Sequence, residues 1–312
     1  MDAQVFSKHV ALQKAVESAL VSLRHHGLLV ISGPTGSGKT FLAHQLHAKV
    51  HGPNSPLISQ HGAGLDEHRF ESQVFGHVKG AFTGATQAYP GLVGMAERGT
   101  LCIEELEATP LEQQAKLLRL LQEKTYRRVG DLNERVFSGT FILTTREGLT
   151  DLLKGGRIRE DLYYRIQHST LTLWPLRDRT LDHGWLFDAL KREVLVQLNI
   201  PHADFKQPDV DAVLKTSLPG NLHSLRSLIM QAVVKGCPLS EVPKQNSKEL
   251  GMEPLPDCGS LKEDLAQCER HLIQRALRRN PFSRDQLAKA LGISRRSLMY
   301  KLKEHQLSER DR

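Results

Sequence analysis

Apolar residues along the chain fall into two alternating patterns, one typical of amphipathic helices and the other of buried strands. Helical spacing covers residues 1–27, 38–50 and 110–123. Short apolar runs that predict strands lie at 28–32, 56–61, 99–105 and 137–145. In the third helix Thr109 is the expected N-cap and Pro110 the first helical residue. Strands that alternate with helices predict an α/β fold, in which a parallel sheet carries helices on both faces.

The pattern changes in the second half of the chain. From about Leu181 the spacing is helical, and the sequence LPGN at 218–221 interrupts it. Residues 238–258 contain four prolines and no periodicity, which predicts a linker. Beyond the linker, two short helices joined around Gly292 predict a helix-turn-helix. The expected parts are an α/β subdomain at 1–178, a helical subdomain at 179–237, the linker at 238–258 and an all-α domain at 259–312.

The first predicted strand leads directly into a glycine-rich segment that reads GPTGSGKT. This is the pattern G-x-x-x-x-G-K-[ST], and strand, turn and helix are the context that it requires. Glycines let backbone N–H groups approach a phosphate, and the helix N-terminus and Lys39 add positive charge. The Thr40 hydroxyl can hold Mg²⁺. The candidate nucleotide-binding residues are Gly33, Pro34, Thr35, Gly36, Ser37, Gly38, Lys39 and Thr40.

The strand predicted at 99–105 ends in two carboxylates, Glu104 and Glu105. Paired acidic residues at a strand end are often simply exposed to solvent, but downstream of a phosphate-binding loop they indicate a catalytic site. One carboxylate can order Mg²⁺ and the other can polarise the attacking water. The sequence therefore predicts Glu104 and Glu105 as catalytic residues, with Glu104 and Thr40 as the metal ligands.

The positive charge is concentrated at the C-terminus. The chain has 312 residues and a formal net charge of +7. Residues 259–312 hold 13 Lys and Arg against 7 Asp and Glu, a balance of +6. A basic module with helix-turn-helix spacing suggests double-stranded DNA as its partner. The candidate DNA-binding residues on its second helix are Ser294, Arg295, Arg296, Ser297 and Lys301.

Cysteine usage and hydropathy predict where such a protein works. The four cysteines include no C-x-x-C pair, which argues against a disulfide framework or a zinc knuckle and fits a reducing cytoplasm. No apolar run approaches the length of a membrane span, and residues 1–30 lack a signal-peptide pattern. We therefore expect a cytoplasmic protein with no membrane partner.

One loop has unusual chemistry. Residues 71–85 read ESQVFGHVKGAFTGA, in which two glycines bracket an aromatic residue and a hydroxyl with no charge between them. Glycine hinges would carry Phe82 to an exposed tip, where a large apolar side chain marks a contact surface. The alternative is a packed phenylalanine beside an ordinary turn, and the spacing alone favours this alternative.

At GAFTGA the chain resembles the sigma-54-dependent transcriptional activators, also called bacterial enhancer-binding proteins, which are AAA+ ATPases. The resemblance runs from about Val5 to Leu307. Its markers are GPTGSGKT, ESQVFGHVKGAFTGA, GTLCIEEL, IREDLYYRI, PLRDR, LPGNLHSLR and a Fis-like C-terminal module. The resemblance implies an AAA+ P-loop domain with a helical lid, followed by a Fis-like helix-turn-helix domain.

The resemblance also implies a role for each motif. Lys39, Thr40 and Glu104 look like ligands of ATP and Mg²⁺, and His223 lies where the family contacts the nucleotide from the lid. Arg159 and Arg165 resemble arginine fingers, which reach the nucleotide of a neighbouring subunit and imply a hexameric ring. The implied sigma-54 contact is Gly80, Ala81, Phe82, Thr83, Gly84 and Ala85. ATP hydrolysis would then remodel the closed complex of sigma-54 RNA polymerase holoenzyme while the C-terminal module binds an enhancer.

Four positions depart from the family pattern. Glu104 replaces an Asp, and His61 replaces an Asn that positions the catalytic Glu. Arg146 replaces the Asn of sensor I, and His223 replaces the Arg of sensor II. Each change spares the P-loop and the arginine fingers, but each touches nucleotide sensing. Together they raise the question of whether the ATPase is self-sufficient.

Three functions therefore stay open. The chain is expected to be an ATP-hydrolysing activator, a weakly hydrolysing regulatory subunit of a mixed ring with a homologue, or a DNA-binding regulator with a relict ATPase domain. An intact GAFTGA counts against the third. Because no receiver or ligand domain precedes the P-loop domain, the chain also resembles the phage-shock activator and the paired activators of type III secretion. Control would then come in trans, for example from an inhibitory protein.

Overall fold

The computed structural model describes residues 7–65, 68–216, 218–242 and 293–305, together with Ile273 and Ala288. The chain divides into two compact units, residues 1–242 and 243–312, and each is described by itself. The expected linker from 243 onward lies outside the described residues. So does the expected first helix of the helix-turn-helix at 283–291, apart from Ala288. No described helix is long and apolar enough to cross a membrane.

The first unit is built on a five-stranded parallel sheet in the order β2-β3-β6-β1-β7. Its strands are β1 (Leu28–Ser32), β2 (Leu57–His61), β3 (Thr100–Glu104), β6 (Thr140–Thr145) and β7 (Thr170–Thr172). β1 and β6 are buried along their whole length, as strands covered on both faces must be. The expected fold class is therefore confirmed.

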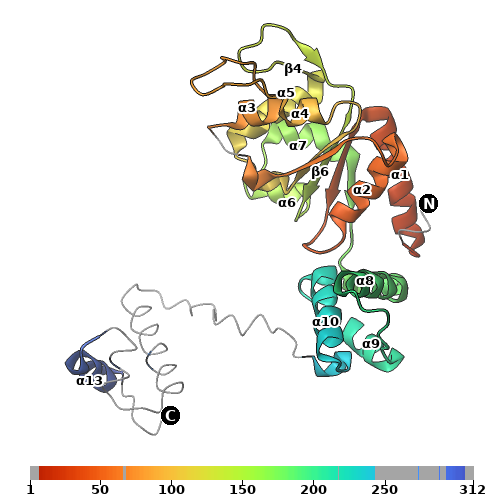
Figure 1. The fold of residues 1–312 in the computed structure, drawn as a ribbon, viewed down its shortest axis with the longest axis vertical. Helices are drawn as coiled ribbons and strands as arrows, with labels where there is room; N and C mark the ends of the chain where they lie inside the picture. The colour runs from red at the N-terminus through yellow and green to blue at the C-terminus, as the bar shows by residue number, and fades with distance from the viewer. Residues whose placement is uncertain are drawn as a thin grey trace. The chain divides into compact units, whose positions relative to one another are not determined.

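Helices cover both faces of this sheet (Figure 1). One face is packed by α1 (Val10–His26) and α2 (Lys39–His51), which bury Leu29 and Ile31 of β1. Leu28 and Val30, which alternate with them, point into the core on the other face. That face is covered by α3 (Phe70–Phe75), α4 (Gly91–Met95), α5 (Leu111–Glu123), α6 (Leu149–Lys154) and α7 (Glu160–Ile166).

A helical lid follows the sheet within the same unit. It consists of α8 (His183–Leu198), α9 (Gln207–Leu214) and α10 (Asn221–Lys235). Their apolar faces share one core with Leu239 and Val242. The lid therefore extends to Val242, beyond the expected end at 237, because these two side chains bury themselves against α9 and α10.

Two local features differ from the sequence predictions. α5 begins at Leu111 and Pro110 holds the N-cap position, so the cap predicted at Thr109 is wrong. Thr109 Oγ1 is buried without a hydrogen-bond partner among the described residues. The antiparallel hairpin of β4 (Thr125–Tyr126) and β5 (Arg135–Val136) was not predicted. Its strands are two residues long, too short for a recognisable period.

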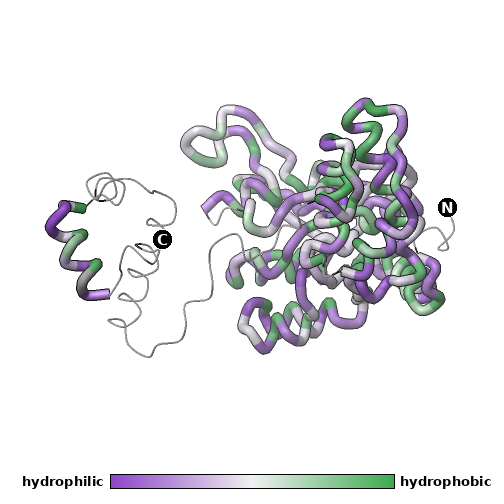
Figure 2. Tube along the Cα trace, turned by 90° about the horizontal axis from the view of Figure 1, so that it is seen from below, coloured by the Kyte–Doolittle hydropathy of each residue, from purple (hydrophilic) through white to green (hydrophobic). Residues whose placement is uncertain are grey.

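Short 3-10 turns complete the connections, at Gly62–Gly64, Leu106–Ala108, Gln167–Ser169, Leu176–Asp178, Thr180–Asp182 and Leu239–Glu241. In the second unit the described helix is α13 (Arg295–Glu304), which carries both hydrophilic and hydrophobic residues (Figure 2). Leu298 is fully buried and packs with Ile273 and Ala288, while Leu302 packs against this cluster.

Candidate nucleotide-binding site and partner surfaces

The predicted P-loop connects the end of β1 to the start of α2. Gly33, Gly36 and Gly38 all have positive φ, at 151°, 73° and 99°. At Gly36 a Cβ atom would lie 2.1 Å from the carbonyl oxygen of Gly220, so the conformation and the packing both demand glycine. The loop thereby takes the open, backbone-lined shape that a phosphate requires.

Lys39 lies at the first position of α2 and folds back over the loop. Its Nζ donates hydrogen bonds to the carbonyl oxygens of Gly33 at 2.6 Å and Pro34 at 3.1 Å. Burial lowers the pKa of the Lys39 ammonium, while the nearby carboxylates of Glu107 and Glu105 act in the opposite direction. The cation is thus held at the loop with acidic side chains around it.

Thr40 and Glu104, the two predicted metal ligands, come together although 64 residues separate them. The Thr40 hydroxyl donates to Glu104 Oε2 over 3.3 Å. Glu104 is the last residue of β3, and Thr40 follows Lys39 in α2. A hydroxyl and a carboxylate are hard oxygen donors, so this pair fits Mg²⁺.

Glu105 follows β3 in a left-handed conformation, with φ 55°, that non-glycine residues seldom adopt. Its N–H donates to Thr144 Oγ1 at 3.1 Å, which fixes the backbone to the neighbouring strand β6. Its carboxylate lies 2.6 Å from two guanidinium nitrogens of Arg146 and 2.9 Å from His61 Nε2. Two of the four departures from the family pattern therefore meet on the predicted catalytic carboxylate.

The lid touches the P-loop directly. The backbone N–H of Leu222 donates to Gly36 O at 3.0 Å, and the Asn221 side chain donates to Thr35 O at 2.8 Å. His223 follows at the same helix start, and its ring would lie 2.9 Å from a Cβ at Gly36. His223 therefore approaches the P-loop from the lid, and its contact with a nucleotide stays a prediction.

The predicted arginine fingers flank α7. Arg159 precedes the helix and makes a bidentate pair with Asp161, with a shortest distance of 2.8 Å. Arg165 lies in the last turn and donates to the carbonyl oxygen of Leu121 at 3.3 Å. Among the described residues, neither side chain forms a hydrogen bond or an ion pair with the P-loop of its own chain.

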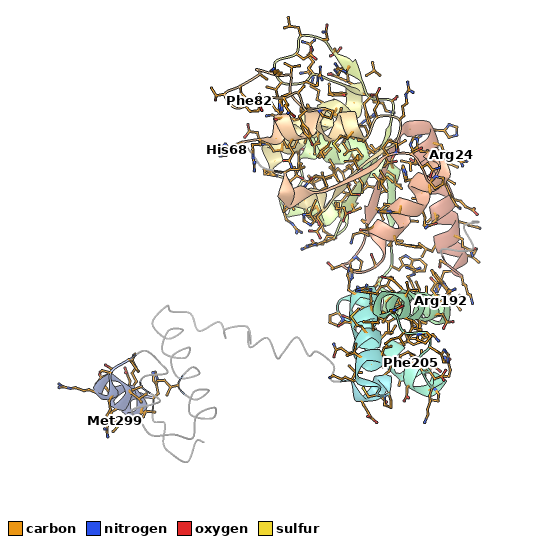
Figure 3. The ribbon with its side chains drawn as sticks, in the orientation of Figure 1. Arg24, His68, Phe82, Arg192, Phe205 and Met299 are labelled. Atoms are coloured by element: carbon orange, nitrogen blue, oxygen red, sulfur yellow. The ribbon has the colours of Figure 1, made fainter. Side chains whose placement is uncertain are left out.

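Phe82 lies in the loop between α3 and α4 and is 47% exposed (Figure 3). The preference for a packed phenylalanine, drawn from spacing alone, was wrong. The loop closes on itself through a hydrogen bond from Gly80 N to Ala85 O at 2.9 Å. The His77 ring packs edge-on against the Phe82 ring, with the ring centroids 5.0 Å apart.

The β4–β5 hairpin supports this loop. Val78 N donates to Val129 O at 3.1 Å, and Val129 N donates to Gly76 O at 2.8 Å. Gly130 packs so closely that a Cβ there would lie 2.9 Å from Ala81 Cβ. At the hairpin turn Leu132 is 92% exposed. The two loops therefore form one joint surface with two exposed apolar side chains.

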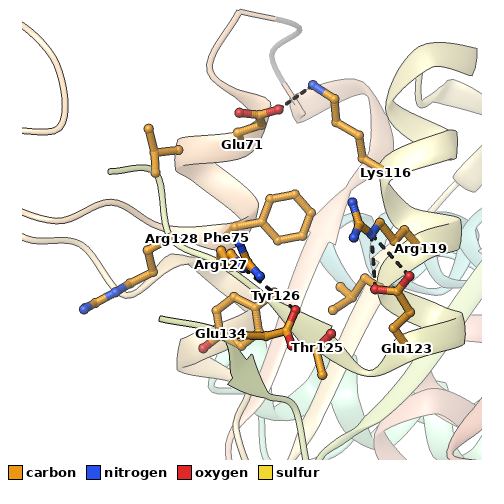
Figure 4. A pocket seen from close by; sticks show the side chains of 12 residues that line it. Glu71, Phe75, Lys116, Arg119, Glu123, Thr125, Tyr126, Arg127, Arg128 and Glu134 are labelled. Carbon is orange, nitrogen blue, oxygen red and sulfur yellow. Dashed lines mark hydrogen bonds and ion pairs between the residues drawn. The ribbon is translucent and has the colours of Figure 1, made fainter. Parts of the chain in front are cut away.

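A pocket of about 400 Å³ lies between α3, α5 and the hairpin (Figure 4). Its charged side chains are all paired: Lys116 with Glu71, Arg119 with Glu123, Arg127 with Glu134, and Arg128 with Asp131, which lies outside the lining. None of the P-loop residues lines it. Because the charges on its walls are already paired, this pocket is a poor receptor for a phosphate.

The predicted DNA-binding residues lie on α13, four of them at its start and Lys301 two turns further along. Ser294 Oγ accepts the N–H of Ser297 at 3.1 Å, which caps the helix. Ser294, Arg295, Arg296 and Ser297 are exposed, and Lys301 is half-buried. Four of the five positions are therefore presented on the surface of this unit.

Sequence reasoning missed a buried network beside the P-loop. Arg179 donates to Asp182 Oδ2 at 2.9 Å and to the P-loop carbonyl of Ser37 at 3.3 Å. The Asp182 carboxylate also accepts hydrogen bonds from the Ser7 hydroxyl at 2.6 Å and from the backbone N–H of Lys8 at 2.5 Å. The motif PLRDR was recognised, but nothing in its spacing separates the buried Arg179 from the exposed Arg177.

Comparison with known proteins adds the family. The model of the sigma-54 interaction domain matches residues 5–172, and that of the bacterial regulatory proteins of the Fis family matches residues 264–305. The regulatory protein AtoC of Escherichia coli K12 is 34% identical over 305 residues, 95% of this chain and 66% of AtoC. The transcriptional activator RocR of Bacillus subtilis is 34% identical over 311 residues, 94% of this chain and 66% of RocR.

A third relative is similar in length as well as in sequence. The pathogenicity-locus regulatory protein HrpS of Pseudomonas savastanoi pv. phaseolicola is 32% identical over 279 residues, 89% of each chain. The solved structure of NtrX from Brucella abortus in complex with ATP superposes with a TM-score of 0.66 at 21% identity. That alignment covers 96% of this chain and 68% of the NtrX chain, and it shows a shared fold. The P-loop unit, the GAFTGA loop and the family matches together place the chain in the sigma-54 interaction-domain family, with a Fis-type helix-turn-helix region at its C-terminal end.

Proposed function

We propose that the chain is a sigma-54-dependent transcriptional activator that binds upstream DNA and uses ATP hydrolysis in a ring to remodel the sigma-54 RNA polymerase holoenzyme. The observation that carries the proposal is the exposed Phe82 in an intact GAFTGA loop, on the same unit as a P-loop. An apolar side chain held at a loop tip is suited to a protein contact rather than to the core.

The nucleotide site has a role for each residue in this proposal. Lys39 and the P-loop N–H groups would bind the phosphates, and Thr40 with Glu104 would hold Mg²⁺. Bound ATP supplies the bond whose hydrolysis drives remodelling. Glu105 would orient the attacking water and accept its proton. Arg159 and Arg165 would reach the site of a neighbouring subunit in a hexamer, which accounts for their exposure away from their own P-loop.

A second candidate is favoured by a specific observation. Arg146 and His61 both engage Glu105, so the water-activating carboxylate is occupied. A chain of this kind would serve as a weakly hydrolysing subunit of a mixed ring with a homologue. ATP turnover of the purified chain at increasing concentration separates the two. Turnover per subunit that climbs with concentration supports a self-assembling ring, and negligible turnover of the folded chain supports the mixed ring.

The sigma-54 contact is tested with Thr83→Ala. Thr83 is exposed, so the change leaves the fold intact. Activation of a sigma-54 promoter in vitro should be lost while ATP hydrolysis and DNA binding persist. Thr86→Ala is the matched control, because Thr86 is also exposed but lies just outside the motif. Full activation by the Thr83→Ala protein would refute the role given to the loop.

A further inference from the structure

The carboxylate of Glu105 is more tightly held than a residue that must activate water should be. Arg146 Nε donates to Glu105 Oε1 and Arg146 Nη2 donates to Oε2, each over 2.6 Å. Two parallel bonds from one guanidinium form the bidentate arrangement that makes arginine–carboxylate pairs strong and directional. Both oxygens of Glu105 are therefore engaged by the same side chain.

His61, the last residue of β2, adds a third bond from the other side of β3. Its Nε2 lies 2.9 Å from Glu105 Oε2, and its Nδ1 accepts the N–H of Ala63 at 3.2 Å. Because Nδ1 is an acceptor, the proton of the neutral ring sits on Nε2 and faces the carboxylate.

The sheet explains why these side chains meet. β3 lies between β2 and β6, so the carboxyl ends of the three strands place His61, Glu105 and Arg146 in a row. The backbone of Arg146 is also fixed, because its N–H donates a hydrogen bond to Glu107 Oε1 at 2.7 Å. Glu105 is 19% exposed and Arg146 53%, so the carboxylate is sheltered while the guanidinium can move outward.

We propose that Arg146 is a positioning residue that, with His61, clamps Glu105, and that opening of this clamp limits ATP turnover in this chain. This inference rests on the proposed nucleotide site. A terminal phosphate offers the guanidinium the same bidentate oxygen geometry as the carboxylate does. Arg146 can therefore exchange Glu105 for the phosphate, which frees the carboxylate to receive water only when a nucleoside triphosphate is bound.

The test replaces the guanidinium by a group that cannot hold both oxygens. In the full-length Arg146→Asn protein, kcat for ATP hydrolysis should rise about tenfold, the factor that corresponds to 1.36 kcal/mol, while KM changes little. Arg146→Lys keeps the charge without the fork and should give an intermediate rise. Arg119→Asn is the matched control, because it removes an exposed arginine–glutamate pair on α5 that does not involve Glu105.

A second readout does not depend on activity. A double-mutant cycle of Arg146→Asn with Glu105→Gln, followed by thermal unfolding without nucleotide, should show that the two shifts of the midpoint are not additive. Additive shifts, or a kcat that falls in Arg146→Asn, would overturn the clamp. The cycle works even in a chain that does not hydrolyse ATP alone, and Thr83→Ala tests the activator function separately, so failures of the two proposals are distinguishable.

Discussion

The carboxylate of Asp182 is fully buried and lies 2.9 Å from Nε of Arg179, which is itself only 2% exposed. Burial raises the pKa of Asp182, but hydrogen bonds from Ser7, Lys8, Trp185 and Arg179 outweigh it and leave the pKa below its usual range. Arg179 also donates to the P-loop at Ser37 O. The pair therefore links the segment before α1, the start of the lid and the phosphate-binding loop.

Loss of this carboxylate should be costly. Asp182→Asn removes the carboxylate that pairs with the buried Arg179, and the expected loss of unfolding free energy is about 3 kcal/mol. Urea unfolding followed by tryptophan fluorescence measures it well, because Trp185 donates to Asp182. The matched control is Asp178→Asn, which removes a carboxylate from the exposed pair with Arg177 and should have little effect. Equal midpoints for the two variants would contradict the assignment.

Two histidines of α2 should make the fold sensitive to acid. His47 lies 2.8 Å from Thr100 Oγ1, and His51 lies 3.0 Å from Thr140 Oγ1, in a network at the start of β3 and β6. Burial lowers the pKa of both rings, so the fold favours their neutral forms. Their contribution to stability is complete above about pH 6.5 and is lost as the pH falls toward the lowered values.

The urea midpoint should therefore decrease below about pH 6.5. A His47→Gln/His51→Gln protein should lose much of this dependence, whereas His25→Gln/His26→Gln, two exposed positions on α1, should keep it. If the two double variants had the same pH profile, the network at the sheet would not be the source of the acid sensitivity.

Cys102 should be inert in the native protein. It is 1% exposed in β3, and burial raises the pKa of its thiol to about 12. Because the thiolate is the reactive form, a disulfide reagent at pH 8 should not label Cys102 until the protein is unfolded. The measurement uses a protein in which Cys237, Cys258 and Cys268 are Ser. Rapid labelling under native conditions would show that β3 opens readily.

Gly130 should control the GAFTGA loop from outside it. In Gly130→Ala the new methyl group would lie 2.9 Å from Ala81, so the loop must shift and promoter activation should fall while ATP hydrolysis continues. Gly236→Ala is the control, since Gly236 also has positive φ, 61°, but nothing lies within 4 Å of a Cβ there. Both changes carry the cost of a left-handed alanine, about 1 kcal/mol. A similar loss of activation in the two variants would show that the contact between Gly130 and Ala81 does not control the loop.

The sequence predicts correctly those elements that follow from local patterns of residues. β1, the P-loop and α2 follow from an apolar run, a glycine motif and helical spacing, and the structure contains all three. The resemblance already implied that His61 lies beside Glu105, but the contact between Arg146 and Glu105 was not predictable. It depends on the order β2-β3-β6, which brings together positions far apart in the chain, and periodicity carries no information on strand order.

The hairpin and the buried network were missed for a different reason. β4 and β5 owe their pairing to contacts with the neighbouring loop rather than to their own composition, and two-residue strands show no alternation. Asp182 looks like an ordinary polar residue before a helix. Its burial is decided by Ser7 and Arg179, one of which is 175 residues away.

One of the hydrogen bonds that join α10 to the P-loop is formed by main-chain atoms alone. Leu222 donates through its backbone N–H and Gly36 accepts through its carbonyl oxygen, so the bond does not depend on the side chain at residue 222. Substitutions there can accumulate without uncoupling the lid, with proline as the exception because it has no N–H. The contact between the lid and the P-loop therefore tolerates changes of side chain at this position, and a homologue could preserve it while its sequence there diverges.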